Sequence, residues 1–208
     1  MKVIDISWPI SEKMTEYKDG KTVKLTPVKS MENNGAREYN LSMSNHTGTH
    51  VDAAAHFLAT GQTIDRIELS LLVGPCRVLD LTSVVDKITP QDLEGFNISQ
   101  HEIILLKTTN SFREATDRFT YSFVYIDKEA AEYLVAQNIK AIGFDYLGIE
   151  RNQPEHETHK AFMQFNIPIV EGLRLGAVSS GNYFFCCLPL NCTGIDSAPA
   201  RAILIEDL

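Results

Sequence analysis

Residues 45–57 read Asn-His-Thr-Gly-Thr-His-Val-Asp-Ala-Ala-Ala-His-Phe and contain three of the six histidines of the chain. His50 and Asp52 would share one face of a strand, because side chains in a strand repeat every two residues. His46 would join them across a turn at the intervening glycine, which has no Cβ to restrict its backbone. A helix that begins after Asp52 would bring His56 to the same side. The four polar side chains of this stretch can therefore converge if the chain turns at Gly48 and then continues in extended or helical form.

These side chains are of the kind that transition metals accept from proteins. Zinc and manganese bind neutral imidazole nitrogen and carboxylate oxygen. Three imidazoles and one carboxylate within eleven residues favour a metal site over four unrelated surface residues. The small residues between them, Gly48 and Ala53–Ala55, would let a metal ion or a substrate approach closely, although the alanines are also good helix formers.

A second group of similar side chains lies much later in the chain. His156 and His159 fall within the predicted helix Pro154–Phe165, and Glu171 follows the predicted strand Ile167–Val170. Taken alone, Glu171 fits a solvent-facing strand end better than a ligand position. Because the first cluster is present in the same chain, a role for these residues as metal ligands is favoured more strongly.

Elsewhere the hydrophobic pattern predicts more strands than helices. The segment Arg37–Asn45 alternates polar and apolar residues, which places Tyr39, Leu41 and Met43 on one face of a half-buried strand. A helix is expected after Asp127, a suitable N-cap residue. The sequence therefore predicts a mixed α/β fold in one domain over residues 1–208. Further strands are expected at Val3–Ile6, Cys76–Leu81, Ile103–Lys107, Ala141–Phe144, Tyr183–Leu188 and Arg201–Ile205.

Composition disfavours several classes of function. The chain has 208 residues, of which 44% are hydrophobic and 22% charged, as in ordinary globular proteins. Its net charge of −8 and its lack of any basic run disfavour nucleic-acid and membrane-surface partners, since both need clustered Lys and Arg. No apolar run approaches the ~18 residues that cross a bilayer, and the N-terminus has no signal-peptide pattern. We therefore expect a cytoplasmic protein.

Covalent catalysis through serine or cysteine is also disfavoured. The sequence has no GxSxG pattern, and Ser179–Gly181 is typical of a loop. The four cysteines are not spaced as zinc ligands. Cys186 and Cys187 are expected on opposite faces of a strand, as buried reduced thiols that make poor nucleophiles.

The histidine stretch resembles the signature of a known family. The pattern His46-x-Gly48-Thr49-His50-x-Asp52-x-x-x-His56-Phe57 is similar to the motif of the cyclase-like metallohydrolases, which include bacterial kynurenine formamidases and isatin hydrolase. The resemblance implies an α/β fold whose mixed sheet forms a central β-barrel-like core with flanking helices. It extends over most of the chain and includes Asp5-Ile6-Ser7, Gly143-Phe144-Asp145, Ile-Pro-Ile-Val-Glu171-Gly172-Leu173 and residues Gly194–Arg201.

The same resemblance implies a metal centre. The residue that matches His56 transfers protons in this family, either as a ligand of a second metal or as a base that binds no metal, so His56 is the expected catalytic residue. One or two divalent ions are implied, with zinc as the first expectation and manganese as the alternative. The implied metal ligands are His46, His50, Asp52, His159 and Glu171, with Asp52 shared when two ions bind.

The implied reaction is hydrolysis of an amide bond in a small carbonyl compound. N-formylkynurenine, cleaved to kynurenine and formate in tryptophan catabolism, is the first expectation. Kynurenine formamidases carry a Trp-Pro-Gly-Asp stretch whose Trp touches the aromatic substrate, and its nearest match here begins at Tyr17. We expect Tyr17 and Phe57 to bind substrate as an apolar wall. The resemblance also implies a homodimer or homotetramer. The alternatives are hydrolysis or cyclisation of another cyclic amide, imide or lactone, and, in another class, a non-enzymatic metal-binding module.

Overall fold

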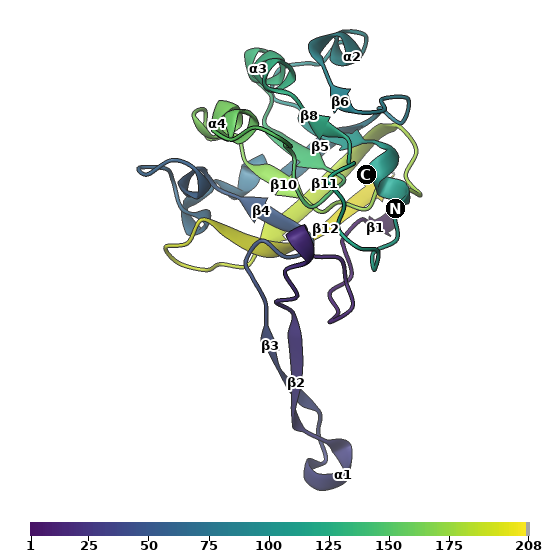
Figure 1. The fold of residues 1–208 in the computed structure, drawn as a ribbon, viewed down its shortest axis with the longest axis vertical. Coiled ribbons are helices and arrows are strands. Elements are labelled where there is room, and N and C mark those ends of the chain that lie inside the picture. Colours follow the sequence, from purple (N-terminus) through teal and green to yellow (C-terminus); the bar gives the residue numbers. More distant parts are fainter. Residues whose placement is uncertain (207–208) are drawn as a thin grey trace.

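The computed structural model describes residues 1–206 and contains one large mixed sheet, two small two-stranded sheets and four short α-helices (Figure 1). The large sheet has the order β1-β12-β11-β5-β7-β9-β10-β4. Its strands are β1 (Lys2–Asp5), β4 (His50–Asp52), β5 (Val73–Asp80), β7 (Ile103–Lys107), β9 (Ala141–Phe144), β10 (Ile169–Glu171), β11 (Gly181–Pro189) and β12 (Ser197–Glu206).

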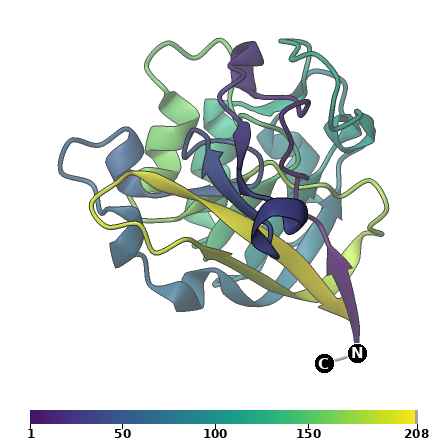
Figure 2. The same cartoon turned by 90° about the horizontal axis from the view of Figure 1, so that it is seen from below.

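Strand β12 closes this sheet into a barrel. Its first residues pair antiparallel with β4, in the register Ser197↔Asp52, while its later residues pair with β11. Seven strands therefore form a closed ring, and β1 is attached outside it along the end of β12. Figure 2 shows β12 crossing the molecule beside β1. The expected mixed α/β fold with a barrel core is confirmed.

Strand β7, which the sequence predicted, is buried on both faces. Ile103 and Leu105 point into the barrel, where they pack with residues such as Phe185. Ile104 and Leu106 point outward, into a second apolar core beneath the helices. A central strand of a parallel sheet covered on both sides has this composition. The helices α2 (Pro90–Glu94), α3 (Lys128–Ala136) and α4 (Glu157–Met163) lie together on that outer side (Figure 1).

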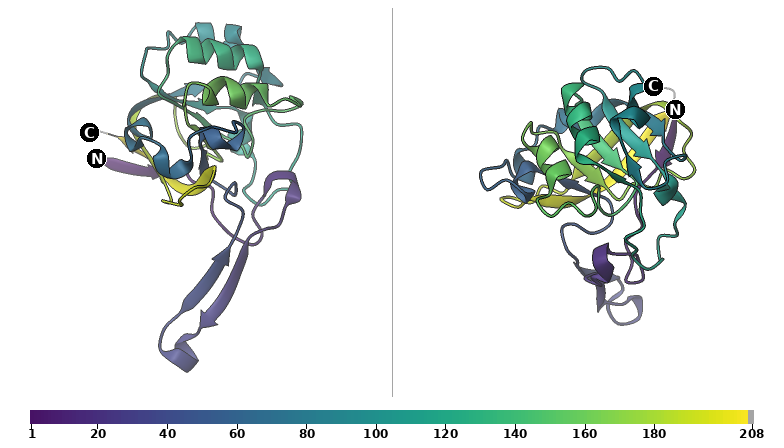
Figure 3. Two further views of the ribbon diagram at one scale, coloured as in Figure 1. Left: turned by 90° about the vertical axis from the view of Figure 1, so that its left-hand side faces the viewer. Right: turned by 45° about the horizontal axis from the view of Figure 1, so that its top comes forward.

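A long hairpin, which we call the arm, projects from the body. It comprises residues 24–42, with strands β2 (Lys24–Lys29) and β3 (Glu38–Ser42) joined by α1 (Met31–Asn34). Figures 1 and 3 show it standing clear of the barrel. The predicted strand is therefore present, but its predicted burial is wrong, because Tyr39 and Leu41 are each 57% exposed.

The remaining elements are short. Strands β6 (Lys87–Ile88) and β8 (Tyr125–Ile126) pair in parallel beside the helices. Asp127 accepts a hydrogen bond from the backbone N–H of Ala130, which confirms it as the N-cap of α3. Within residues 1–206 no helix is long and apolar enough to cross a membrane.

Candidate metal centre

Pairing between β4 and β10 creates the floor of the site. The register sets His50 opposite Glu171 and Asp52 opposite Ile169. Because side chains alternate along a strand, His50 and Asp52 leave the sheet on one face, whereas Val51 enters the barrel core. Each of the three polar side chains is at most 5% exposed. The two-residue repeat of side chains along β4, which the sequence showed, therefore brings His50 and Asp52 together. Pairing with β10 adds Glu171.

The turn before β4 is held by a close approach of two backbones. Gly48 and Gly172 both have positive φ, and a Cβ on Gly172 would lie 2.2 Å from the carbonyl oxygen of Gly48. The hydroxyl of Thr49 donates to the carbonyl of Gly172 at 2.6 Å. His50 Nδ1 lies 2.9 Å from the Gly48 carbonyl and donates to it, which leaves Nε2 unprotonated in the neutral ring. That Nε2 lies 3.5 Å from carboxylate oxygens of both Asp52 and Glu171.

His46 and His56 meet at a carboxylate that the sequence analysis did not assign to the site. Asp196 precedes β12, and one of its oxygens lies 2.8 Å from His46 Nε2 and 2.9 Å from His56 Nδ1. The 3-10 turn Ala54–His56 carries His56 back towards His46, so their ring centroids are 4.1 Å apart. The other nitrogen of His46, Nδ1, lies 3.0 Å from Asp52. Asp196 therefore orients both imidazoles.

Helix α4 supplies the last ligand candidate from the opposite wall. His159 Nε2 lies 3.3 Å from Glu171 and 3.9 Å from Asp52. Its Nδ1 lies 3.0 Å from Glu150, a second carboxylate that the sequence analysis did not assign. Glu150 also contacts His156 Nδ1 at 2.5 Å. A carboxylate on the outer nitrogen of a ligating histidine fixes the ring and raises its basicity.

The residues present fit a divalent metal. Among residues 1–206, His50 Nε2 and both carboxylate oxygens of Asp52 are buried without a hydrogen-bond partner. Buried polar atoms without partners are costly, and a metal ion would satisfy them together. The atoms of His50, Asp52 and Glu171 lie within 4.8 Å of one another, as do those of His46, Asp52 and His56. Imidazole and carboxylate donors in this mixture suit zinc and manganese alike.

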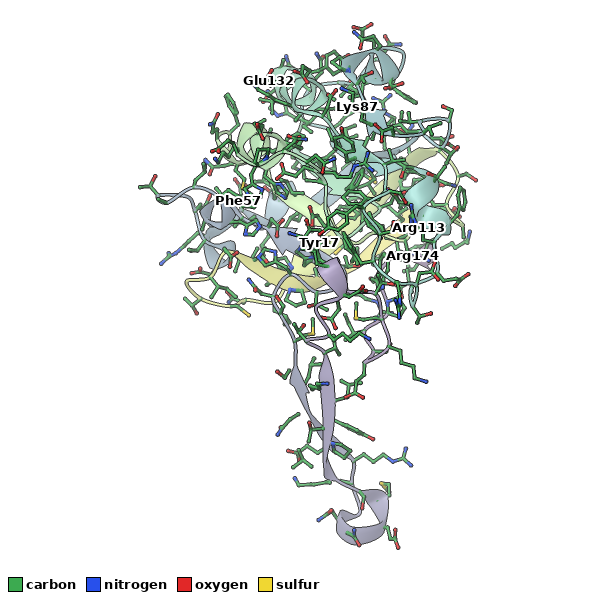
Figure 4. All side chains as sticks on the ribbon, in the orientation of Figure 1. Tyr17, Phe57, Lys87, Arg113, Glu132 and Arg174 are labelled. Atoms are coloured by element: carbon green, nitrogen blue, oxygen red, sulfur yellow. The ribbon has the colours of Figure 1, made fainter. Side chains whose placement is uncertain are left out.

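A cavity of about 320 Å³ opens above these atoms. Phe57 forms one wall, with its ring stacked on that of His156 at 4.0 Å. Tyr17 forms another, edge-on to Phe119, and Lys18 lies at the same rim. Figure 4 labels Tyr17 and Phe57. Both residues that the sequence assigned to substrate therefore line the same pocket as His46, His56, His159 and Glu171.

The charges of the site shift the pKa values of several of its groups. Burial opposes the charged form of His46, but its contacts with Asp52 and Asp196 outweigh burial and raise the pKa to about 9. Burial likewise opposes the charged form of His159, whereas Glu150 and Glu171 raise its pKa to about 10. Burial would raise the pKa of Asp52, but the charges of His50 and His46 hold it well below its usual range.

Binding of a divalent metal is therefore expected to release protons. Without metal, His46 and His159 hold their protons at pH 7, because their pKa values lie near 9 and 10. A ligating imidazole must be neutral, so binding at pH 7 would release up to two protons, and the apparent affinity would rise with pH towards pH 9. Titration calorimetry in buffers of different ionisation enthalpy measures this number. Heats that are the same in every buffer would contradict the expectation.

Comparisons with known proteins agree with this geometry. A family model described as "Putative cyclase" matches residues 4–151. A kynurenine formamidase of Bacillus cytotoxicus is 30% identical over 203 residues, which cover 97% of this chain and 96% of that protein. A solved structure described as a potential metal-dependent hydrolase with cyclase activity is 39% identical, with a TM-score of 0.89, over 100% of this chain and 99% of that one. Isatin hydrolase A of Labrenzia aggregata has a TM-score of 0.84 at 21% identity, over 99% of this chain and 94% of that one, and shares the fold.

Proposed function

This chain belongs to the cyclase family, and from that membership we propose that it hydrolyses the formyl amide of an aromatic amine, with N-formylkynurenine as substrate and kynurenine and formate as products. The chain is a cyclase-like hydrolase. One observation supports an aromatic formamide as the substrate. Buried atoms of His50 and Asp52 that have no hydrogen-bond partner within residues 1–206 lie beneath a pocket whose walls include Tyr17 and Phe57. The polar floor suits a carbonyl group, and the aromatic walls suit a ring.

The proposed metal ligands are the five residues that meet at this floor. Bound there, a zinc ion, or manganese as the alternative, would acidify a water and polarise the amide carbonyl. Asp52 is the carboxylate shared by the His46 and the His50 clusters, so its position allows one ion or two. The ligands are His46, His50, Asp52, His159 and Glu171.

The proposed reaction then needs one proton carrier. Water adds to the formyl carbon, the carbon–nitrogen bond breaks, and the leaving amine takes a proton. His56 lines the pocket, and its Nδ1 is held by Asp196, so Nε2 is the nitrogen left to exchange that proton. Burial raises the pKa of Tyr17 to about 12, with a further contribution from the charge of Glu171, so the phenol stays protonated as a hydrogen-bond donor to substrate.

The proposal is tested by measuring hydrolysis of N-formylkynurenine before and after a chelator removes metal, and again after Zn²⁺ or Mn²⁺ is restored. Isatin, a cyclic imide and a lactone are assayed beside it. We expect activity on the formamide that is lost with metal and returns with zinc. Activity confined to the cyclic compounds would replace the formamidase with a ring-opening hydrolase. If none of the compounds is hydrolysed although zinc binds tightly, a non-enzymatic metal-binding module would be favoured.

A further inference from the structure

A second cavity adjoins the pocket above the proposed metal ligands. It has a volume of about 340 Å³, and four residues line both cavities, namely Tyr17, Lys18, Glu150 and His156. The two spaces are therefore parts of one cleft, with the metal ligands at one end only. A formamide and its aromatic ring fit in the first cavity, of about 320 Å³, which leaves the second for a part of the substrate remote from the bond that breaks.

Two segments that line the second cavity have left-handed backbone at residues with a Cβ. Lys18 has a φ of 53°, and Asn152 and His156, in the other segment, each have a φ of 56°. Such residues sparsely populate the left-handed region, and they persist there where the surrounding structure or a ligand site requires it. The conformation of both segments therefore fits a role in binding a ligand.

Two cationic side chains line this cavity. The ammonium of Lys18 lies 5.0 Å from the centroid of the Tyr17 ring and forms no ion pair within residues 1–206. The side chain of Arg151 is 13% exposed, is held by an ion pair with Asp86, and lies over the ring of Tyr125. Its Nε is buried without a hydrogen-bond partner within residues 1–206. Lys18 therefore has its charge free for a ligand, and Arg151 is a fixed cation beside the same space.

Negative charge at this cavity is already paired. Glu150 is the carboxylate that lines it, and one of its oxygens lies 2.5 Å from Nδ1 of His156 and 3.0 Å from Nδ1 of His159. The unpaired charge at the cavity is therefore that of Lys18, which attracts an anion and repels a cation.

We propose that the second cavity is a subsite for a carboxylate at the far end of the substrate, and that Lys18 is the residue that selects it. This role of Lys18 rests on the proposed function, in which N-formylkynurenine is a formamide whose ring carries an amino-acid tail with a carboxylate. With the formamide at the metal ligands, the tail would pass Tyr17 and reach Lys18, since both residues line the two cavities. The ammonium then donates charge-assisted hydrogen bonds to the carboxylate. The preferred substrates are therefore acidic aryl formamides.

Binding of two compounds that differ in the tail tests this role without any reaction. Kynurenine has the whole amino-acid tail, whereas kynurenamine keeps the amine of the tail and lacks its carboxylate. Titration calorimetry on the zinc-loaded protein should show kynurenine binding about 10-fold or more tightly than kynurenamine. Lys18→Met should remove most of this preference, and Lys18→Glu should reverse it.

Lys21→Met is the matched control for Lys18→Met. Lys21 is an exposed lysine with positive φ in the same loop, and it lines neither cavity. Its replacement should change the preference for kynurenine by less than about 3-fold, because a charge in open solvent contributes little.

Steady-state kinetics then separate selection of the tail from the chemistry. Lys18→Met should raise KM for N-formylkynurenine about 10-fold and change kcat less than about 3-fold, because the lost contact is made equally in the ground state and the transition state. Formanilide, the formamide of an unsubstituted ring, should be hydrolysed with the same kcat/KM by the wild type and by Lys18→Met.

Equal affinities of the wild type for kynurenine and kynurenamine would overturn the subsite, as would an absence of kynurenine binding. Equal effects of Lys18→Met and Lys21→Met would overturn the role of Lys18, and so would an equal loss of kcat/KM on formanilide and on N-formylkynurenine. Failure of the proposed function gives a different result. Neither formamide would then be hydrolysed, while kynurenine would still bind through Lys18, which removes the formamidase and supports the subsite.

Discussion

Replacing Asp52 by Asn is expected to cost this protein most of its metal and nearly all of its activity. Asp52 is 1% exposed, and neither of its oxygens has a hydrogen-bond partner within residues 1–206. It also belongs to both the His50 and the His46 clusters that could hold an ion. The amide keeps the shape of the carboxylate and removes its charge. Removing one partner of a buried charged pair costs about 3–5 kcal/mol, which is roughly 10²–10⁴-fold in zinc affinity.

Three measurements check this expectation. Zinc content after dialysis should fall towards zero, hydrolysis should fall with it, and the rise in melting temperature expected for the wild type with zinc should be absent. Asp145→Asn is the matched control, because Asp145 is also fully buried but is bound by Thr108 and Ser111, away from the metal ligands. Asp145→Asn should lose stability and keep its zinc stoichiometry. An Asp52→Asn protein that binds zinc as tightly as the wild type would contradict the assignment of Asp52 as a ligand.

The sequence could predict only those contacts of the site that join residues close together in the chain. His50 and Asp52 share a face because a strand repeats every two residues, and His56 returns to them through one short turn. The meeting of this segment with β10 depends on closure of the barrel by β12, which no local pattern encodes. Glu171 could therefore be named as a candidate ligand, but its pairing with His50 needed the structure.

Asp196 and Glu150 show what sequence reasoning missed. Each is a single carboxylate in a loop; Asp196 has no histidine near it in the sequence, and Glu150 precedes His156 by six residues across an irregular segment. Asp196 lies in the Gly194–Arg201 stretch that carries part of the family resemblance, which was the available signal for it. Asp196 holds nitrogens of two histidines that are distant in the sequence, whereas Glu150 holds Nδ1 of His159, nine residues after it. Such second contacts are set by packing, so they have no signature of their own.

The arm and α4 show two further limits. Alternation predicted a strand containing Tyr39 and Leu41, but it could not say whether the body of the same chain covers that face. The helix predicted at Pro154–Phe165 spans only Glu157–Met163, and its start is set by His156, which adopts a left-handed backbone conformation just before it. That conformation directs the His156 ring onto Phe57 and Glu150, so a local departure from the helical pattern coincides with the pocket wall.

Replacing His56 by Ala is expected to lower kcat by about 10²–10⁴-fold while zinc affinity changes by less than about 10-fold, because the role proposed for His56 is proton transfer. Burial and the charges of His46 and His159 lower the pKa of His56 below its ordinary value of 6.5, although Asp52 opposes the shift. The neutral base is therefore the form present at pH 7. At saturating zinc, which offsets proton competition at His46 and His159, wild-type activity should fall as the pH drops through this lowered value, and that acid limb should be absent from the residual activity of His56→Ala.

Asp196→Asn separates positioning of His56 from the chemistry itself. The substitution removes the carboxylate that holds Nδ1 and should cost about 10–100-fold in kcat, measured at saturating zinc because Asp196 also contacts His46. Since Asp196 acts through His56, the double variant should be little worse than His56→Ala alone. Full additivity would show that Asp196 acts independently, and loss of zinc from His56→Ala would show that His56 is primarily a ligand. Retention of wild-type kcat by His56→Ala would remove it from the reaction altogether.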